Sequence, residues 1–333
     1  MGRTLLICSG GGHLKQLFTL ADRIGILPEQ QTWVTFDNDL SRSILADREV
    51  VYAPFAAPRD AKNIVRIRIM ASWVLGNGVF DQAISTGSSP AVAFLPAAAR
   101  RGISAHYIES AARAAGPSIS GRILSHFRQI RTYTQYPVWS NMRWHYRGSI
   151  FDAYARGPSS SRTHPARAVV SVGTQEGYGF DRLFHAVVPL LAGFSEVLWQ
   201  TGPQDVSRFG INGHHGVPHH ELQEAISGSD VVIAHAGTGA ALTAIEAGKT
   251  PILIPRLARY GEHVDDHQVQ IASELDRRGL ALMRNPEQLT SDDLAHAASR
   301  SVRRVSAPPF ELDDAASTRR QGQTECLHRT ARQ

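Results

Sequence analysis

The sequence contains very little cysteine, and its cysteines are placed where they are not expected to pair. Among 333 residues only Cys8 and Cys326 occur, the first inside an apolar run and the second in a polar tail. This usage favours a reduced, cytoplasmic compartment over a disulfide-built secreted fold. No apolar stretch approaches the roughly 18 to 20 residues of a membrane-spanning helix, and the first residues lack the pattern of a secretory signal.

Lysine is also scarce, so arginine carries nearly all of the positive charge. Lysine occurs only as Lys15, Lys62 and Lys249, although the formal net charge is +5. A basic protein suits nucleic acid, an anionic membrane surface or phosphorylated substrates. The sequence lacks zinc-finger spacing, an aromatic RNA-binding motif and a clear helix-turn-helix pattern. Nucleic acid is therefore not an expected partner.

Two familiar phosphate-binding motifs are missing from the glycine-rich start of the chain. The segment LLICSGGGHLKQL, residues 5–17, runs from an apolar strand through three glycines into a predicted helix. The dinucleotide fingerprint G-x-G-x-x-G finds Gly10 and Gly12, but Lys15 stands where the third glycine is required. The phosphate-loop pattern is absent as well. A strand that leads through glycines into a helix still predicts an anion site, because N–H groups at the helix start are unpaired.

Apolar runs alternate with helix-like stretches through the first half of the chain. Such alternation predicts right-handed βαβ units around a parallel sheet. We predict strands at 4–8, 32–36, 50–52, 82–85, 103–108 and 129–134, with helices at 14–24, 60–76 and 89–101.

The same alternation restarts after a stretch rich in serine, proline and arginine. We interpret this stretch, residues 156–167, as a linker. The residues from about 305 onward have little apolar content and are predicted to be mostly disordered. Between them we predict strands at 168–172, 196–200, 230–234 and 251–255, with helices at 180–191, 220–226, 239–247 and 264–279.

These patterns predict an α/β fold with two Rossmann-like parallel-sheet domains in tandem. The predicted domains are residues 1–155 and 168–304, followed by the tail 305–333. Ligands of such sheets bind at the carboxyl ends of the strands, so the expected site is a cleft between the domains. Two-domain transferases, dehydrogenases and binding proteins share this layout, so the layout alone does not decide the function.

The second half carries a more specific pattern. DVVIAHAGTGAALTAIEAGKTPILIPR at 230–256 is followed by GEHVDDHQVQIASELDRRG at 261–279. In order, these hold a strand, His-x-Gly, a helix with a glutamate two turns in, a glycine-to-proline entry to the next strand, and an acidic-x-Gln pair. This half strongly resembles the nucleotide-sugar-binding domain of glycosyltransferase family 28, which implies a GT-B fold.

The first half resembles a different component of such systems. SGGGH, STGSSPAVAFLPAAARRG, HYIESAARAAGPSISGRIL and TQYPVW are similar to the membrane-anchoring acceptor subunit of two-component UDP-N-acetylglucosamine and exopolysaccharide glycosyltransferases. The resemblance implies a fusion of the acceptor and catalytic subunits, with the acceptor half first.

The resemblance implies roles for residues of the second half. The glutamate on the helix, Glu246, would accept the two ribose hydroxyls, and Asp266 with Gln268 would contact the donor sugar. The residues implied at the donor nucleotide and its diphosphate are Thr174, Gln175, His235, Gly237, Thr238, Gly239 and Glu246.

The family inverts the anomeric carbon by direct displacement, which needs a base for the acceptor hydroxyl. His13 is the candidate, since histidine titrates near neutrality, and it could instead only cap a helix or bond to backbone. Glu109 is the other candidate base or an acceptor-sugar ligand, unless Arg113 pairs with it. The loop Gly10, Gly11 and Gly12 would face the cleft and the phosphates, and Arg256 or Arg259 would balance the leaving-group charge. No metal and no cofactor is expected.

A lipid-carried acceptor implies contact with the membrane surface. Two segments have the expected mixture of apolar, aromatic and basic side chains, 63–80 and 135–148, although either could be an ordinary packed segment. The predicted contact residues are Arg66, Arg68, Trp73, Trp139 and Trp144. The expected location is peripheral, at the inner face of the cytoplasmic membrane.

The histidine run HHGVPHH, 214–220, is not expected to bind metal, because adjacent histidines point to opposite faces. A loop facing the nucleobase is the favoured interpretation.

We therefore expect an inverting, metal-independent transferase that moves a sugar from a UDP-sugar to a polyprenyl-diphosphate-linked sugar during polysaccharide assembly, with assembly proteins as further partners. Two alternatives stay open: a non-catalytic sugar-nucleotide sensor or scaffold, and a soluble transferase acting on a small natural product.

Overall fold

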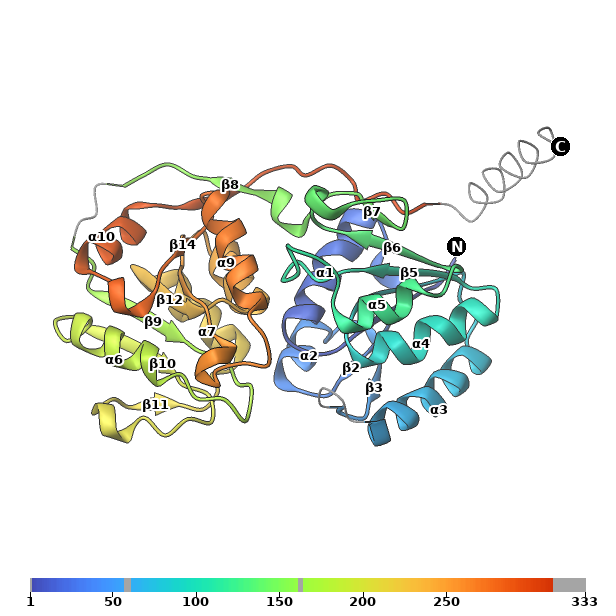
Figure 1. Cartoon of the computed structure of the whole chain (residues 1–333), viewed down its shortest axis with the longest axis horizontal. Helices are drawn as coiled ribbons and strands as arrows, with labels where there is room; N and C mark the ends of the chain where they lie inside the picture. The colour runs from blue at the N-terminus through green and yellow to red at the C-terminus, as the bar shows by residue number, and fades with distance from the viewer. Residues whose placement is uncertain (1, 57–60, 161–163, 314–333) are drawn as a thin grey trace.

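The computed structural model describes residues 2–56, 61–160 and 164–313. Within these ranges the chain forms two parallel sheets, each flanked by helices, and one antiparallel pair of short strands (Figure 1). The predicted α/β class with two Rossmann-like domains is confirmed. None of the helices in these ranges combines the length and the hydropathy that a membrane span requires.

The first sheet has seven parallel strands in the order β3-β2-β1-β4-β5-β6-β7. Its central strand β1 is buried along its whole length, as expected of a strand covered on both faces. The strands are β1 (Thr4–Cys8), β2 (Gln31–Phe36), β3 (Glu49–Ala53), β4 (Gln82–Gly87), β5 (Ser104–Ile108), β6 (Ile130–Thr134) and β7 (Trp144–Tyr146). The helices are α1 (Gly12–Ile24), α2 (Asp39–Ile44), α3 (Ala61–Asn77), α4 (Ser89–Arg100) and α5 (Ile119–Ser125).

The second sheet has six parallel strands in the order β11-β10-β9-β12-β13-β14. They are β9 (Arg167–Ser171), β10 (Glu196–Gln200), β11 (Gly213–His214), β12 (Val231–His235), β13 (Ile252–Ile254) and β14 (Leu282–Met283). Its helices are α6 (Asp181–Leu190), α7 (His219–Gly228), α8 (Thr238–Glu246), α9 (His267–Arg277) and α10 (Ser291–Ser299).

Both sheets reverse their strand order at the centre, between β1 and β4 and between β9 and β12. At such a reversal the loops after neighbouring strands diverge and leave a crevice for ligands. The strand–loop–helix units β1–α1 and β12–α8 both leave their sheets at these points, so the fold directs the glycine-rich segments toward a common region.

One hydrophobic cluster crosses the domain boundary. Leu14 and Leu17 of α1 belong to the same buried cluster as Leu242 of α8 and Ile271 of α9. These side chains are fully buried, and burying an aliphatic side chain stabilises by about 1.5–3 kcal/mol. The two domains are therefore packed against each other along α1 and α8.

The predicted strands and helices are present with ends shifted by a few residues, and several short elements were not predicted. These are the strands β7, β8 (Tyr154–Arg156), β11, β14 and β15 (Val302–Arg304) and the helices α2, α5 and α10. The largest shift is at α9, predicted from residue 264 but beginning at His267.

The prediction of disorder from residue 305 is wrong for the part of the tail that the structure describes. β15 (Val302–Arg304) pairs antiparallel with β8 (Tyr154–Arg156), next to the predicted linker, and the chain then returns along the first domain (Figure 1). Phe310 is 1% exposed, and its N–H donates to the Arg23 carbonyl. Buried Phe310, together with the hydrogen bonds of Val305 and Pro308 to the first domain, thus anchors a segment whose composition suggests disorder. Residues 161–163 and 314–333 lie outside the described part.

Candidate functional site

Helices α1 and α8 begin against each other at the domain junction. α1 starts at Gly12 after β1, and α8 starts at Thr238 after β12. A Cβ on Gly12 would lie 3.1 Å from the Gly239 nitrogen and 3.3 Å from the Thr238 Cβ, so the two backbones meet without a side chain between them. Each helix start carries unpaired N–H groups and partial positive charge. Two such ends at one junction favour an anion such as a diphosphate.

The other two glycines of the first loop are also constrained. A Cβ on Gly10 would lie 2.5 Å from the Asn38 side-chain nitrogen, and Gly11 has a φ of 64°, which side-chain-bearing residues rarely adopt. The loop therefore depends on glycine for its approach to the second domain.

His13 stands in the first turn of α1 and is held by the end of β4. Its Nδ1 lies 2.8 Å from the Thr86 carbonyl oxygen, which can only accept, so Nδ1 carries the proton. Nε2 is then left as a lone-pair acceptor. Burial lowers the pKa of His13 to about 4, although the Thr86 bond opposes the shift. At neutral pH the ring is a neutral base with one free nitrogen.

Glu109, at the end of β5, is 1% exposed and accepts four hydrogen bonds. The donors are the Tyr107 hydroxyl at 3.1 Å, the Ser110 N–H at 2.9 Å, and the Ser118 N–H and hydroxyl at 2.9 and 3.0 Å. Burial raises the pKa of this carboxyl. The arrangement anchors the segment between residues 109 and 118. The alternative pairing with Arg113 does not occur, because Arg113 instead pairs with Asp265 of the second domain at 2.9 Å.

His235 ends β12 beside the other half of the junction. Its Nδ1 is 3.3 Å from the Ser171 carbonyl oxygen, and its ring packs on Gly173, where a Cβ would come within 2.9 Å of Cε1. Gly173 has a φ of 74°. Burial, with a contribution from Arg256, lowers the pKa of His235 to about 3. Thr174 and Gln175 follow on the exposed loop after β9.

Glu246 lies at the last turn of α8 and faces the first domain. Its Oε2 is 3.4 Å from the Lys15 Nζ, and this nitrogen also donates to the Thr243 hydroxyl at 2.6 Å. The Lys15 side chain is 5% exposed and that of Glu246 is 31% exposed. Sequence reasoning noted Lys15 only as a departure from the dinucleotide fingerprint. It is the side chain that reaches across the junction to Glu246.

Asp266 and Gln268 both hold the loop between β13 and α9. The Ala258 N–H donates to Asp266 Oδ1 at 2.8 Å, and the Arg256 N–H donates to Gln268 Oε1 at 3.0 Å. Arg256 or Arg259 was expected to balance the leaving-group charge, and the packing of Arg256 speaks against the first of these two residues, whereas Arg259 is exposed. The Arg256 side chain is 4% exposed, donates to the Val172 carbonyl at 2.9 Å, and lies over the Phe180 ring. Its guanidinium is occupied by the loops that it joins.

The histidine run 214–220 borders the same region. A Cβ on Gly216 would lie 3.6 Å from the Thr174 methyl carbon. Burial lowers the pKa of His219 to about 4, with a smaller contribution from Lys15. Within the described ranges this run forms no metal-capable group; the group with that geometry is His263, Asp265 and His267, which sequence reasoning missed.

The predicted membrane residues separate into two sets. Arg66, Arg68 and Trp73 lie on the exposed side of α3, and Trp73 is 64% exposed. The prediction that Trp144 contacts the membrane is wrong, because its side chain is 5% exposed and packs against the rings of Trp139 and Tyr107. Trp139 is only partly exposed.

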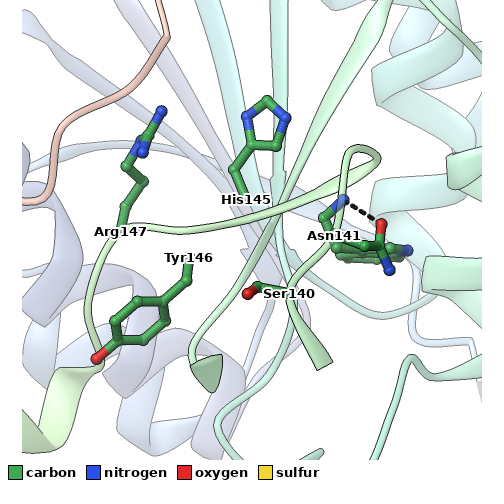
Figure 2. A pocket seen from close by; sticks show the side chains of 6 residues that line it. Ser140, Asn141, His145, Tyr146 and Arg147 are labelled. Carbon is green, nitrogen blue, oxygen red and sulfur yellow. Dashed lines mark hydrogen bonds between the residues drawn. The ribbon is translucent and has the colours of Figure 1, made fainter. Parts of the chain in front are cut away.

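A shallow pocket beside β7 lies apart from the helix junction. Figure 2 shows His145 and Arg147 on one side of the strand and Tyr146 on the other. Both His145 and Arg147 contact the Asp313 carboxylate at 2.6 Å, so this hollow serves to attach the returning tail segment.

Comparisons with known proteins agree with this architecture. Residues 167–319 match the family described as glycosyltransferase family 28 C-terminal domain. The UDP-N-acetylglucosamine transferase subunit ALG13 of Yarrowia lipolytica is 38% identical over 58 residues, which span 17% of this chain and only 28% of that protein.

Solved structures share the fold across both domains. MurG of Acinetobacter baumannii has a TM-score of 0.56 at 18% identity, with 88% of this chain and 89% of that chain covered. The glycosyltransferase SnogD from Streptomyces nogalater has a TM-score of 0.54 at 17% identity, covering 90% and 94%. A UDP-GlcNAc 2-epimerase from Methanocaldococcus jannaschii has a TM-score of 0.58 at 9% identity, covering 93% and 96%. At these identities the likeness shows the fold alone. The second domain thus matches the glycosyltransferase family 28 C-terminal domain over residues 167–319, and the chain as a whole has the two-domain GT-B fold.

Proposed function

We propose that the protein is an inverting glycosyltransferase that uses a UDP-sugar as donor and a polyprenyl-diphosphate-linked sugar as acceptor. The observation that carries the proposal is the junction of α1 and α8, where two helix starts meet at Gly12 and Gly239 with His13 in the adjacent turn. One of these helices belongs to the family 28 domain. The 58 residues similar to the Yarrowia subunit support the same donor class.

The donor would lie along the second domain. Unpaired N–H groups at the start of α8, with the Thr238 hydroxyl, would receive the diphosphate. Glu246 is two turns further along the same helix and, with one oxygen near Lys15, has its other oxygen available for ribose hydroxyls. Asp266, on the loop into α9, would contact the sugar, whereas Gln268, which is 3% exposed and accepts the Arg256 N–H, would hold that loop in place.

The first domain would supply the base. Nε2 of His13 takes the proton of the acceptor hydroxyl while that oxygen bonds to the anomeric carbon of the donor. The bond from the anomeric carbon to the UDP oxygen breaks, so the configuration inverts and UDP leaves with the electron pair. The helix starts stabilise the charge that develops on the diphosphate. Glu109, with four donors on its carboxylate, positions the strand-end loop beside this centre.

An exposed face of α3 supports a lipid-linked acceptor. Val65, Ile69 and Trp73 recur every four residues and are 57%, 68% and 64% exposed. Residues at this spacing share one helix face. Arg66 and Arg68 are exposed on the same helix. An apolar stripe beside basic side chains is typical of a helix that lies on an anionic membrane surface.

The test measures UDP-sugar binding and transfer together. We would titrate UDP calorimetrically, then follow transfer from a panel of UDP-sugars to a short-chain polyprenyl-diphosphate sugar. Glu246→Gln should weaken UDP binding by about tenfold or more, since hydrogen bonds to a charged group contribute about 1.5–3 kcal/mol. Glu224→Gln, at an exposed position of α7, is the matched control. Absence of UDP binding by the unaltered protein would refute the proposal.

The same panel separates the alternatives. A natural-product transferase is the second candidate, because proteins described as the glycotransferase of kitacinnamycin and as a spinosyn forosaminyltransferase share the fold, with TM-scores of 0.55 and 0.53 at 14% and 16% identity. It would ignore the lipid-linked sugar and anionic vesicles, and would glycosylate small hydroxylated aromatic compounds. A sensor or scaffold would bind UDP without transfer or hydrolysis of any donor.

A further inference from the structure

Three side chains at the entrance to α9 form a compact cluster that the proposed reaction does not use. One donor atom each from His263, Asp265 and His267 lies within 4.8 Å of the others. The cluster spans the loop between β13 and α9, and Gln268 follows directly after it. Its spacing, His-x-Asp-x-His, is visible in the sequence.

Asp265 is the shared member of the cluster. Its Oδ1 contacts the His267 Nδ1 and lies 4.0 Å from the His263 Nδ1. Its other oxygen, Oδ2, receives the Arg113 guanidinium from the first domain at 2.9 Å. The carboxylate is therefore oriented from outside the cluster, with Oδ1 turned to both imidazoles.

His263 has a buried nitrogen without a partner. Its side chain is 9% exposed, and its Nδ1 has neither a hydrogen-bond partner nor contact with solvent. The ring is fixed by stacking on Tyr178, at a centroid distance of 5.6 Å, and by edge contact with His267 at 4.6 Å. Leaving such a buried polar atom unsatisfied costs about 1–3 kcal/mol. A ligand on this nitrogen would remove that cost.

We propose that His263, Asp265 and His267 bind one divalent first-row transition ion, with Zn²⁺ as the expected occupant. Two imidazoles and one carboxylate are a common donor set for such ions, and they leave positions open for water. Mg²⁺ and Ca²⁺ are disfavoured, because they require oxygen ligands. In a tetrahedral Zn²⁺ site neighbouring donors lie about 3.3 Å apart. The hydrogen-bonded Asp265–His267 pair would therefore have to separate, while His263, whose Nδ1 lies 4.0 Å from Asp265 Oδ1, would have to move closer.

The electrostatics of the cluster agree with this chemistry. Nδ1 of His263 is not committed to any hydrogen bond, so it is available to a ligand. His267 now donates from Nδ1 to Asp265, and on ion binding that proton moves to the other ring nitrogen. Arg113 neutralises only the oxygen that faces away from the imidazoles. Because Arg113 belongs to the first domain, ion binding would link the donor loop to the domain junction, without a part in the transfer step itself.

The experiment measures Zn²⁺ and Co²⁺ binding to the full-length chain without a histidine tag. We expect one ion per chain, with a Co²⁺ visible spectrum typical of nitrogen and oxygen ligands. His263→Ala and His267→Ala should each weaken binding by more than the roughly 10- to 100-fold that loss of a ligand-orienting group causes. Arg113→Gln, which removes only a group that orients Asp265, should weaken Zn²⁺ binding by roughly 10- to 100-fold. Mg²⁺ should not compete.

A matched control separates this site from the other histidine-rich segment. His220, whose side chain is 70% exposed, lies in the run 214–220; His220→Ala should bind Zn²⁺ like the unaltered protein. The proposal is overturned if the unaltered protein binds no Zn²⁺, if binding survives in the His263→Ala and His267→Ala proteins, or if it is lost in His220→Ala instead. The Co²⁺ spectrum of the unaltered protein decides the matter even if a variant fails to fold.

Discussion

Each domain places a histidine in the same way beside the junction, but the surroundings of its second ring nitrogen differ. In the first domain His13 directs Nδ1 to the Thr86 carbonyl and packs on Gly87; in the second, His235 directs Nδ1 to the Ser171 carbonyl and packs on Gly173. Both glycines have positive φ, 113° and 74°, so a side chain at either position would be strained and would meet the imidazole. In each sheet, the end of the neighbouring strand supplies the carbonyl and the glycine that position the imidazole ring.

The difference lies in the second ring nitrogen. A Cβ on Gly237 would lie 2.3 Å from Nε2 of His235, so the following turn passes close to that nitrogen and requires glycine there. His13 instead stands on the first turn of a helix, with its Nε2 uncommitted among the described contacts. His235 therefore supports a loop, whereas His13 presents a base. Equivalent positions in two similar domains need not share a role.

The largest expected effect tests this division. His13→Ala should lower the transfer rate by about 10²- to 10⁴-fold, the usual contribution of a general base, with little change in UDP affinity. His235→Ala should act first on UDP affinity and on the free energy of unfolding, because its ring supports the loop after β9. The measurement is kcat and the UDP dissociation constant for both variants. Equal losses of kcat would remove the distinction.

The pH profile sharpens the same point. With a pKa of about 4, His13 stays neutral as the pH falls from about 7 to about 5. The transfer rate should therefore hold over this range, whereas a base with the ordinary histidine pKa would lose about 25-fold. An acid limb centred near the ordinary value would show that another group accepts the proton.

Gly12 tests how closely the two domains must meet. A valine there would force methyl groups against Thr238 and Gly239, and such overpacking costs about 1–3 kcal/mol. We expect Gly12→Val to lower the free energy of unfolding by this amount and to weaken UDP binding. Gly76→Ala, at a position in α3 with open space around it, should be neutral or stabilising by less than about 1 kcal/mol. Similar denaturation midpoints for the two variants would mean that the junction tolerates separation.

Much of this arrangement could be predicted from the sequence, because buried parallel strands consist of short runs of apolar residues. Residues 4–8 and 231–235 carry that pattern, and each leads into glycines and a helix. The order of the predicted strands and helices along the chain then limits the fold to two Rossmann-like domains. Edge strands of two or three residues, such as β11 and β14, are too short for any periodicity to reveal.

Side-chain partners could not be predicted in the same way, because they depend on tertiary contacts. Glu109 was a candidate base by residue type, but its four donors come from residues whose positions only the fold defines. Trp144 belongs to an aromatic and basic segment that is typical of membrane contact, yet it lies inside the first domain. The burial of Phe310 could likewise not be predicted, because the surrounding sequence is mostly polar.

Buried histidines offer a further contrast, with His106 serving only the first sheet. It is 2% exposed, and its ring nitrogens contact the Ser104 and Tyr133 hydroxyls. Burial lowers its pKa to about 3. The unfolded state thus binds more protons as the pH falls below about 6.5, so folded stability decreases, by about 2 kcal/mol at pH 5.

The check compares His106→Gln with the unaltered protein in denaturant titrations at about pH 7.5 and about pH 5. The variant should lose less stability between the two pH values, since glutamine does not titrate. An identical pH dependence would assign the acid sensitivity to His13, His235 or other groups near the junction.

The smallest effect concerns one of the ion pairs that join the two domains. Lys15 and Glu246 form the ion pair at the end of α8, and Lys15 also donates to Thr243. A double-mutant cycle with Lys15→Met and Glu246→Gln should give a coupling of about 0.5–1 kcal/mol in unfolding free energy. The coupling is modest because Glu246 is partly solvated, and it should decrease with added salt.

Saturating UDP should change this coupling if Glu246 binds the ribose. The hydroxyls would then compete with Lys15 for the carboxylate, so the cycle repeated with UDP should give a smaller value than the cycle without it. A coupling that UDP leaves intact, together with an unaltered UDP affinity in Glu246→Gln, would make Glu246 a purely structural link between the domains. In that case the ribose would need another partner, and Lys15 would owe its burial to domain packing alone.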